Sequence, residues 1–376
     1  MIVGRVAASA VQRQVRHVTP VPARSASSLV GRVYEQVADE MRLVIPPALM
    51  HSPSPQALAA YWMLMREPLL VSGTVDRASK EAAAAAVAVA TICPYCVDMH
   101  SVSMYDLVGG HDADKLAADR AGDMRDPRLR EISQWARGAQ ESPGGLPVPT
   151  WLTPAQSTEL VGTVTAMHYL TRMVNVFLSS FLLPPGVTGR ARQRMKQGLG
   201  RLLRETLRAH REPGRSLDLL PDAPVPADAG WAAGNPFIAG AVARAAATFD
   251  GAGERWLTPE VRAVVYEHLD DWRGADTGIS TAWCEDLLAG LGPADRAAGR
   301  LTLLTAVSSH QVGDEVVAEF RRHVPGDQAL VEVAGWAAFE AARRIGARQR
   351  IAAHGAHQET RRSASHNTMK SHPHFT

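Results

Sequence analysis

Cysteine is scarce in this chain, since only three of its 376 residues are cysteine. So few cysteines exclude a small fold held together by disulfides and indicate a reducing compartment. Aromatic residues make up only 6% of the chain, whereas 46% of the residues are hydrophobic and 21% are charged, an ordinary balance for a folded globular protein. The length predicts two domains of ordinary size or two copies of one motif.

The chain also lacks an excess of charge, because 40 basic residues face 38 acidic ones. No strong field therefore attracts nucleic acid or an anionic membrane, and we expect neither as a partner. The most apolar stretch, residues 160–185, is interrupted by His168 and Arg172, whereas a membrane-spanning helix needs about 20 apolar residues. The basic residues 1–28 imitate a transit peptide, but we interpret them as a flexible start and predict a cytoplasmic protein.

Apolar residues recur at helical spacing along most of the chain, with breaks at proline and glycine. Five consecutive alanines at 82–86 favour a long helix, because alanine is the best helix former. The sequence therefore predicts an all-α fold. The expected helices cover residues 33–44, 57–66, 74–92, 94–107, 112–121, 129–139, 160–181, 189–210, 239–248, 259–272, 277–288, 293–307, 312–323 and 327–345.

The predicted organisation has five parts, divided where composition changes. These are a flexible N-terminus (1–28), a catalytic helical half (29–188), an Arg-rich helix with a Pro/Asp linker (189–229), a degenerate helical half (230–347) and a disordered His-rich tail (348–376).

A weak internal echo relates the two halves. When the first half is shifted by 215 residues, the segment 80–105 lies over 295–320. In this register Cys93 meets Ser308, Cys96 meets Gln311, His100 meets Glu315 and Glu81 meets Arg296. Two helical repeats are therefore expected, with the chemistry kept in the first and lost in the second.

One segment concentrates the reactive side chains. Cys93 and Cys96 form a C-x-x-C pair where Pro94 predicts a helix start. A helix N-terminus favours a thiolate and lowers the pKa of a cysteine there. His100 follows one helical turn after Cys96, on the same face, and its imidazole can take up the thiol proton. Glu81, on the preceding helix, can orient that imidazole if the two helices are antiparallel.

The spacing of these four residues resembles that of the alkylhydroperoxidase D-like group of the carboxymuconolactone decarboxylase superfamily. Cys93 follows Glu81 by twelve positions, Cys96 follows Cys93 by three, and His100 follows Cys96 by four. The resemblance is strong over residues 46–110 and extends to about 184.

The resemblance implies an all-helical fold that assembles as a homo-oligomer and reduces a peroxide substrate without a bound cofactor or metal. It implies that Cys96 is the peroxidatic cysteine, that Cys93 resolves it as a Cys93–Cys96 disulfide, and that His100 and Glu81 relay protons. A dithiol reductant or a lipoyl-type carrier protein would regenerate the pair. Members of the group carry a histidine between the cysteines, where this chain has Pro94 and Tyr95.

Other functions remain open from the residues alone. Cys-Pro-Tyr-Cys also occurs in glutaredoxins, whose thioredoxin-like fold needs strands around the motif. Cys93, Cys96 and His100 could bind zinc, but no fourth ligand is evident. The thiols could instead be inert or sense redox state on a helical scaffold, and the superfamily also contains lactone decarboxylases that lack this cysteine pair. His168, Tyr169, Arg172 and Asn175 could line a pocket or merely form the polar edge of a helix.

Overall fold

A computed structural model describes residues 14–23, 28–141, 146–179, 181–183 and 186–368, with side chains as far as residue 349. The described part is all-α, as predicted, and its only β-type pairing is an isolated bridge between Val15 and Leu178. None of its helices is both long and apolar enough to cross a membrane. The α-helices are α2 (Ser28–Met41), α3 (Pro46–His51), α4 (Pro55–Met65), α5 (Arg77–Ala90), α6 (Pro94–Leu107), α7 (Gly110–Ala117), α8 (Pro127–Gly138), α9 (Pro154–Phe177), α10 (Gly189–Arg208), α11 (Pro236–Trp256), α12 (Pro259–Asp271), α13 (Ala282–Leu288), α14 (Pro293–Val307), α15 (Asp314–His323) and α16 (Asp327–Thr368). A π-helical turn, η2 (Arg66–Leu70), and short 3-10 turns η3 (Ala121–Asp123), η4 (Ala139–Glu141), η5 (Leu217–Leu219), η6 (Ala227–Gly234) and η7 (Ser309–Gln311) connect them.

Local sequence explains where most helices begin. Proline stands in the first turn of α3, α4, α6, α8, α9, α11, α12 and α14, where its missing N–H costs nothing. The side chains of Ser54, Asp76, Asp126, Thr153, Asn235 and Thr258 accept backbone N–H groups at helix starts. The cap at Asp76 therefore starts α5 at Arg77, three residues later than the predicted 74.

Helix α5 is the buried centre of the first half. It packs against α6, α8 and α9, and residues 82–88 have no exposed surface. Because the alanine side chain is small, neighbouring helices approach α5 from several sides without clashing. This helix places Glu81 near its start and leads directly into Cys93 beyond its end.

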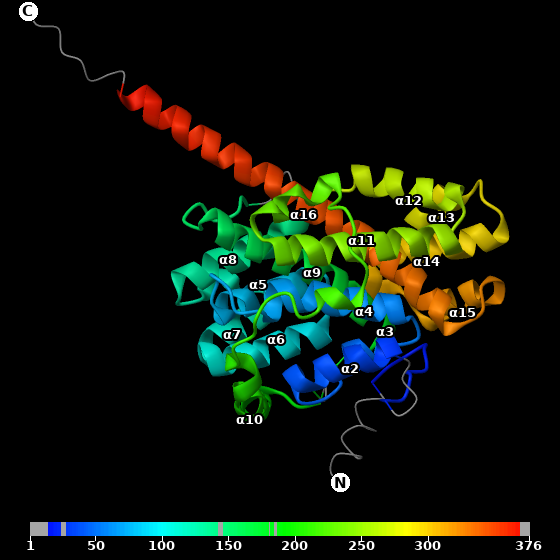
Figure 1. The fold of residues 1–376 in the computed structure, drawn as a ribbon, viewed down its shortest axis with the longest axis horizontal. Coiled ribbons are helices and arrows are strands. Elements are labelled where there is room, and N and C mark those ends of the chain that lie inside the picture. The colour runs from blue at the N-terminus through cyan, green and yellow to red at the C-terminus, as the bar shows by residue number, and fades with distance from the viewer. Residues whose placement is uncertain (1–13, 24–27, 142–145, 180, 184–185, 369–376) are drawn as a thin grey trace, which may run out of the picture.

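The two halves share one continuous hydrophobic core rather than two separate cores. Helix α9 of the first half packs along α16 of the second half, and α16 also contacts α11 and α14. In Figure 1, α16 runs through the body and its C-terminal part projects beyond the other helices. Helix α14 lies within two residues of where the 215-residue shift places α5, whereas α15 begins five residues later than the shifted α6, and the relationship between the halves remains a prediction.

The ends of the chain differ from the prediction. Part of the N-terminus expected to be flexible is attached to the second half, since Arg16 pairs with Asp314 at 2.9 Å and the Thr19 N–H donates to Asp327 at 2.7 Å. Residues 1–13 and 24–27 lie outside the described residues. The C-terminal tail is predicted to begin at 348, and helix α16 extends to Thr368. The remainder of that tail, 369–376, is also outside the described residues.

The segment 189–229 is also more closely packed than a linker. In α10, Gly200 lies against α6, where a Cβ atom would stand 2.9 Å from the Val102 carbonyl oxygen. Further on, the buried carboxylate of Glu67 accepts hydrogen bonds from the Gly214 N–H at 2.8 Å and the Ser216 hydroxyl at 2.6 Å. The Pro/Asp-rich stretch, residues 212–229, is called the strap below. It packs against the first half, because its hydrogen bonds compensate the buried charge of the Glu67 carboxylate.

Candidate active site

The two cysteines meet at the junction between α5 and α6. Cys93 is the N-cap of α6 and Cys96 lies in its first turn, so the proline-started helix places both sulfurs on one side. Their Sγ atoms are 2.7 Å apart, compared with about 2.05 Å in a disulfide, and both cysteines are free thiols. Both side chains are buried, with 1% and 3% of their surface exposed.

The residue before this pair has an unusual backbone. Ile92 has a φ of 51°, in the left-handed region that β-branched residues avoid. Its neighbour Cys93 donates its backbone N–H to the Ala88 carbonyl oxygen at 2.9 Å, which turns the chain sharply from α5 into α6. The turn makes the two helices neighbours, as the sequence analysis required for Glu81 to reach His100.

Glu81 and His100 form a buried pair. The Nδ1 atom of His100 lies 2.7 Å from Glu81 Oε2, and the glutamate is only 1% exposed. On its other oxygen Glu81 accepts a hydrogen bond from Arg77 Nε at 2.7 Å. Burial raises the pKa of Glu81, but Arg77 and His100 together outweigh it and hold the pKa at about 2. The carboxylate is therefore ionised at neutral pH and holds the imidazole in a fixed orientation.

Arg77 is a site residue that the sequence analysis missed. It lies one helical turn before Glu81, and its Nη2 atom is 2.6 Å from the same carboxylate oxygen. The spacing of four residues on a helix was a signal for this ion pair. Arg77 also donates from Nη1 to the Leu69 carbonyl oxygen at 3.3 Å, so it joins α5 to the end of η2.

The thiol pair and the His100–Glu81 pair are not joined by a hydrogen bond among the described residues. His100 Nδ1 is engaged by Glu81, and its Nε2 atom has no partner in the described part of the chain. The expected low pKa at the helix start is not found, because burial raises the pKa of the Cys96 thiol well above its usual value and contact with Cys93 acts in the same direction. Deprotonation of Cys96 therefore needs a base.

An apolar cavity of about 130 Å³ adjoins these residues. His100, Glu81 and Arg77 form its polar end, while the cysteines are not among its lining residues. Its other walls come from Met41, Ile45, Pro46, Pro47, Tyr61, Trp62, Met65, Leu69, Leu70, Tyr95, Met99, Ser103, Leu170, Leu203, Thr206 and Leu207. Such a lining suits an apolar ligand that carries one reactive polar group.

Two tyrosines connect the cavity with the cysteine turn. Tyr95, between the cysteines, donates its hydroxyl to the Gln14 side chain at 3.2 Å, and Tyr61 stacks on the buried His51 with ring centroids 4.4 Å apart. Burial raises the pKa of both phenols, and the nearby Cys96 acts in the same direction. Both therefore stay protonated at neutral pH. The sequence offered no local signal for Tyr61, because it reaches the site only through packing of α4.

The second half offers a different arrangement at the corresponding positions. Ser308, which meets Cys93 in the predicted 215-residue register, pairs its hydroxyl with that of Thr277 at 2.5 Å. The third cysteine, Cys284, is buried, and its thiol donates to the Thr281 carbonyl oxygen at 2.9 Å.

Among the residues with described positions, no group of three or more His, Cys, Asp or Glu side chains could hold a metal ion. The strands that a thioredoxin-like fold needs around its motif are absent from the described ranges, so the glutaredoxin alternative was wrong.

Comparison with known proteins points to one relative. The chain is 38% identical over 333 residues to a curated protein of Mycobacterium tuberculosis named alkyl hydroperoxide reductase. The match covers 88% of this chain and 94% of the relative, so it includes both halves. No family model matches the chain.

Proposed function

This chain belongs to the alkylhydroperoxidase D-like family, and on that premise we propose that it is a thiol-dependent reductase of alkyl hydroperoxides. The observation that carries the proposal is the buried His100–Glu81 pair at the polar end of an apolar cavity, one helical turn from two sulfurs 2.7 Å apart. The name of the relative supports the same activity.

The first step we propose is attack by Cys96. His100 accepts the thiol proton at Nε2, and the Cys96 thiolate attacks the hydroperoxide, so that the O–O bond breaks and an S–O bond forms. The proton passes to the departing alkoxide, which leaves as the alcohol, and Cys96 becomes a sulfenic acid. The ionised Glu81 stabilises the imidazolium that His100 transiently becomes.

Cys93 completes the two-electron cycle. Its thiol attacks the Cys96 sulfenic acid, water leaves, and a Cys93–Cys96 disulfide forms. An external dithiol then reduces this disulfide and is itself oxidised, which restores both thiols. We propose a dithiol reductant or a lipoyl-type carrier for this role, and a cytoplasmic homo-oligomer as the working form.

The cavity predicts a preference among peroxides. Because its walls are apolar, cumene hydroperoxide should be reduced with a higher kcat/KM than hydrogen peroxide, which buries no apolar surface. Enlarging Leu170, which lines the cavity, to Trp should lower kcat/KM for cumene hydroperoxide and leave hydrogen peroxide nearly unaffected. Equal losses for both substrates would place the peroxide elsewhere.

The central experiment compares Cys96→Ser with Cys284→Ser in the full chain. Peroxide consumption is followed with dithiothreitol as reductant, and oxidised samples are digested and analysed by mass spectrometry for a 93–96 cross-link. We expect Cys96→Ser to abolish turnover and Cys284→Ser to retain it, because Cys284 is engaged with Thr281 in the other half. Wild-type turnover by Cys96→Ser would refute the assignment.

The burial of the thiols favours one second candidate, a redox sensor. Both sulfurs are nearly inaccessible and Cys96 is protonated at rest, which suits a slow, stoichiometric oxidation. The number of oxidation cycles, measured with peroxide and dithiothreitol in excess, distinguishes the two functions. Repeated cycles support the reductase, whereas one oxidation per chain supports the sensor. Lactone decarboxylation would instead survive alkylation of both thiols.

A further inference from the structure

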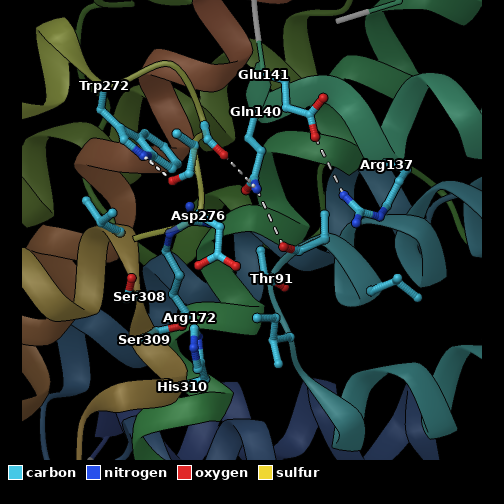
Figure 2. A pocket seen from close by; sticks show the side chains of 16 residues that line it. Thr91, Arg137, Gln140, Glu141, Arg172, Trp272, Asp276, Ser308, Ser309 and His310 are labelled. Atoms are coloured by element: carbon cyan, nitrogen blue, oxygen red, sulfur yellow. Dashed lines mark hydrogen bonds and ion pairs between the residues drawn. The ribbon is translucent and has the colours of Figure 1, made fainter. Parts of the chain in front are cut away.

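A second cavity lies between the two halves of the chain; neither the cysteines nor His100 line it, although Ile92, which precedes Cys93, lies on its wall. It has a volume of about 170 Å³ and is bounded by the end of α5, by η4, by α9 and by the segments after α12 and α14. Figure 2 shows Arg172 and His310 on one side of it and Trp272 and Gln140 on the opposite side. Apolar wall is supplied by Val89, Ile92, Trp272 and Val307.

The segment that follows α12 forms one wall of the cavity, and specific contacts fix its position. Gly274 has a φ of 83°, and a Cβ atom on it would stand 2.3 Å from the Gln140 carbonyl oxygen. The Gln140 side chain donates to the Gly274 and Ala90 carbonyl oxygens, both at 3.5 Å, and Trp272 Nε1 donates to the Ala275 carbonyl oxygen at 3.1 Å. The cavity is therefore a formed site rather than a gap between loose segments.

Arg172 is the distinctive group in this cavity. Its side chain is only 2% exposed, yet it forms no ion pair with any described carboxylate. Nε donates to the Ala306 carbonyl oxygen at 2.7 Å and Nη1 to the His168 carbonyl oxygen at 2.8 Å, whereas Nη2 has no partner among the described residues. Trp272 covers the guanidinium, with its ring centroid 6.0 Å away. A buried charge of this kind is costly unless a counter-ion joins it.

The other charges around the cavity favour a ligand with a single negative charge. Arg137 lies between two carboxylates, Asp119 at 3.0 Å and Glu141 at 3.7 Å, so its charge is already compensated and is not available to a ligand. Burial lowers the pKa of His310 although Asp276 opposes this, so the imidazole is neutral at pH 7. Asp276, at the exposed side, accepts the Gly278 N–H at 2.9 Å and forms no ion pair with a described residue. Its charge offsets much of the charge of Arg172, so the cavity has too little positive charge for a doubly charged anion.

We propose that this cavity binds a small monocarboxylic acid, whose carboxylate accepts from Arg172 Nη2 and whose apolar body lies against Trp272 and Val307. The hydroxyl of Ser309 stands beside the site and already accepts from Asn175 Nδ2 at 3.0 Å, which leaves its own proton for a carboxylate oxygen. The site is independent of the peroxidase proposal, because it uses neither the cysteines nor His100.

The test measures binding of benzoate to the full chain by isothermal titration calorimetry, with benzamide as the neutral counterpart and inorganic phosphate as the alternative anion. Benzoate should bind at least tenfold more tightly than benzamide, because the amide carbonyl can accept the same hydrogen bond but carries no charge to pair with the buried guanidinium. It should also bind more tightly than phosphate. Failure of benzoate to bind, or equal affinity for benzamide, overturns the proposal, and preference for phosphate overturns the carboxylate class.

Three variants locate the site. Asp276→Asn should tighten benzoate binding about fivefold by removing a repelling charge, whereas Asp271→Asn, the same change at an exposed residue outside the lining, should not alter it. Arg172→Gln should weaken binding at least tenfold. Since Arg172→Gln could fail to fold, a second variant, Ala275→Trp, is used as well. Its larger side chain, at an exposed lining position, should fill the cavity and abolish benzoate binding. Unchanged affinity in both Asp276→Asn and Ala275→Trp would place benzoate elsewhere and overturn the assignment.

Discussion

The charge on Glu81 should make an identifiable contribution to the pH dependence of stability. Its pKa of about 2 in the folded protein lies below the ordinary 4.5, so folding favours the ionised form. The stabilisation is therefore fully present above pH 4.5 and is lost as pH falls towards 2. A shift of this size corresponds to about 3 kcal/mol, of which roughly 2 kcal/mol should be lost by pH 3.

The perturbation that isolates this contribution is Glu81→Gln. The amide keeps the size of the side chain but cannot ionise, so the variant lacks the pH-dependent term and leaves Arg77 without its counter-charge. Urea unfolding is followed by tryptophan fluorescence from pH 7 to pH 3. The free-energy difference between wild type and variant should be largest at pH 7 and narrow by about 2 kcal/mol at pH 3.

A matched control is Glu260→Gln, which removes an exposed carboxylate on α12. Its curve should run close to the wild-type curve across this range. Parallel curves for wild type and Glu81→Gln would refute the reasoning, because they would mean that the buried carboxylate is no better stabilised in the folded protein than in the unfolded chain. In the same variant, peroxide turnover should fall by about a hundredfold or more, the usual contribution of acid–base assistance.

Three further substitutions test the packing around the site. Ala85→Leu, at a position with no exposed surface on α5, should lower the free energy of unfolding by about 1–3 kcal/mol in urea titration. An unchanged unfolding midpoint would show that α5 is not tightly packed at this position. Ile92→Asn should raise stability by about 1 kcal/mol, because asparagine tolerates the left-handed backbone and the isoleucine is half exposed; a loss of stability would mean that its packing outweighs the strain. Ser54→Ala should cost about 1–3 kcal/mol in thermal unfolding, since its hydroxyl caps α4 and donates to the buried Glu332 at 2.8 Å. Ser280→Ala should cost less in the same measurement, because the exposed Ser280 hydroxyl accepts only the Ala282 N–H, at 3.1 Å.

The proposed chemistry depends on how a buried thiol becomes reactive. Cys96 is protonated at rest because burial opposes its charge, and the nearest base of suitable chemistry on its helix is His100. Burial also protects the thiolate from water once it forms. In the proposed reaction, the cavity beside His100 and Glu81 would let a peroxide approach the base before it meets the sulfur.

The amino-acid sequence by itself determined the helical class, most helix starts and the spacing of the four candidate site residues on and between α5 and α6. These features are local: a proline or a capping side chain acts within one turn, and the 12-3-4 spacing needs only two neighbouring helices. The tertiary structure decided how the charges are compensated. Glu67 accepts hydrogen bonds from Gly214 and Ser216 in the strap, and Arg172 has no carboxylate partner among the described residues. Pairing of buried charges depends on contacts between segments far apart in the chain, which no local pattern encodes.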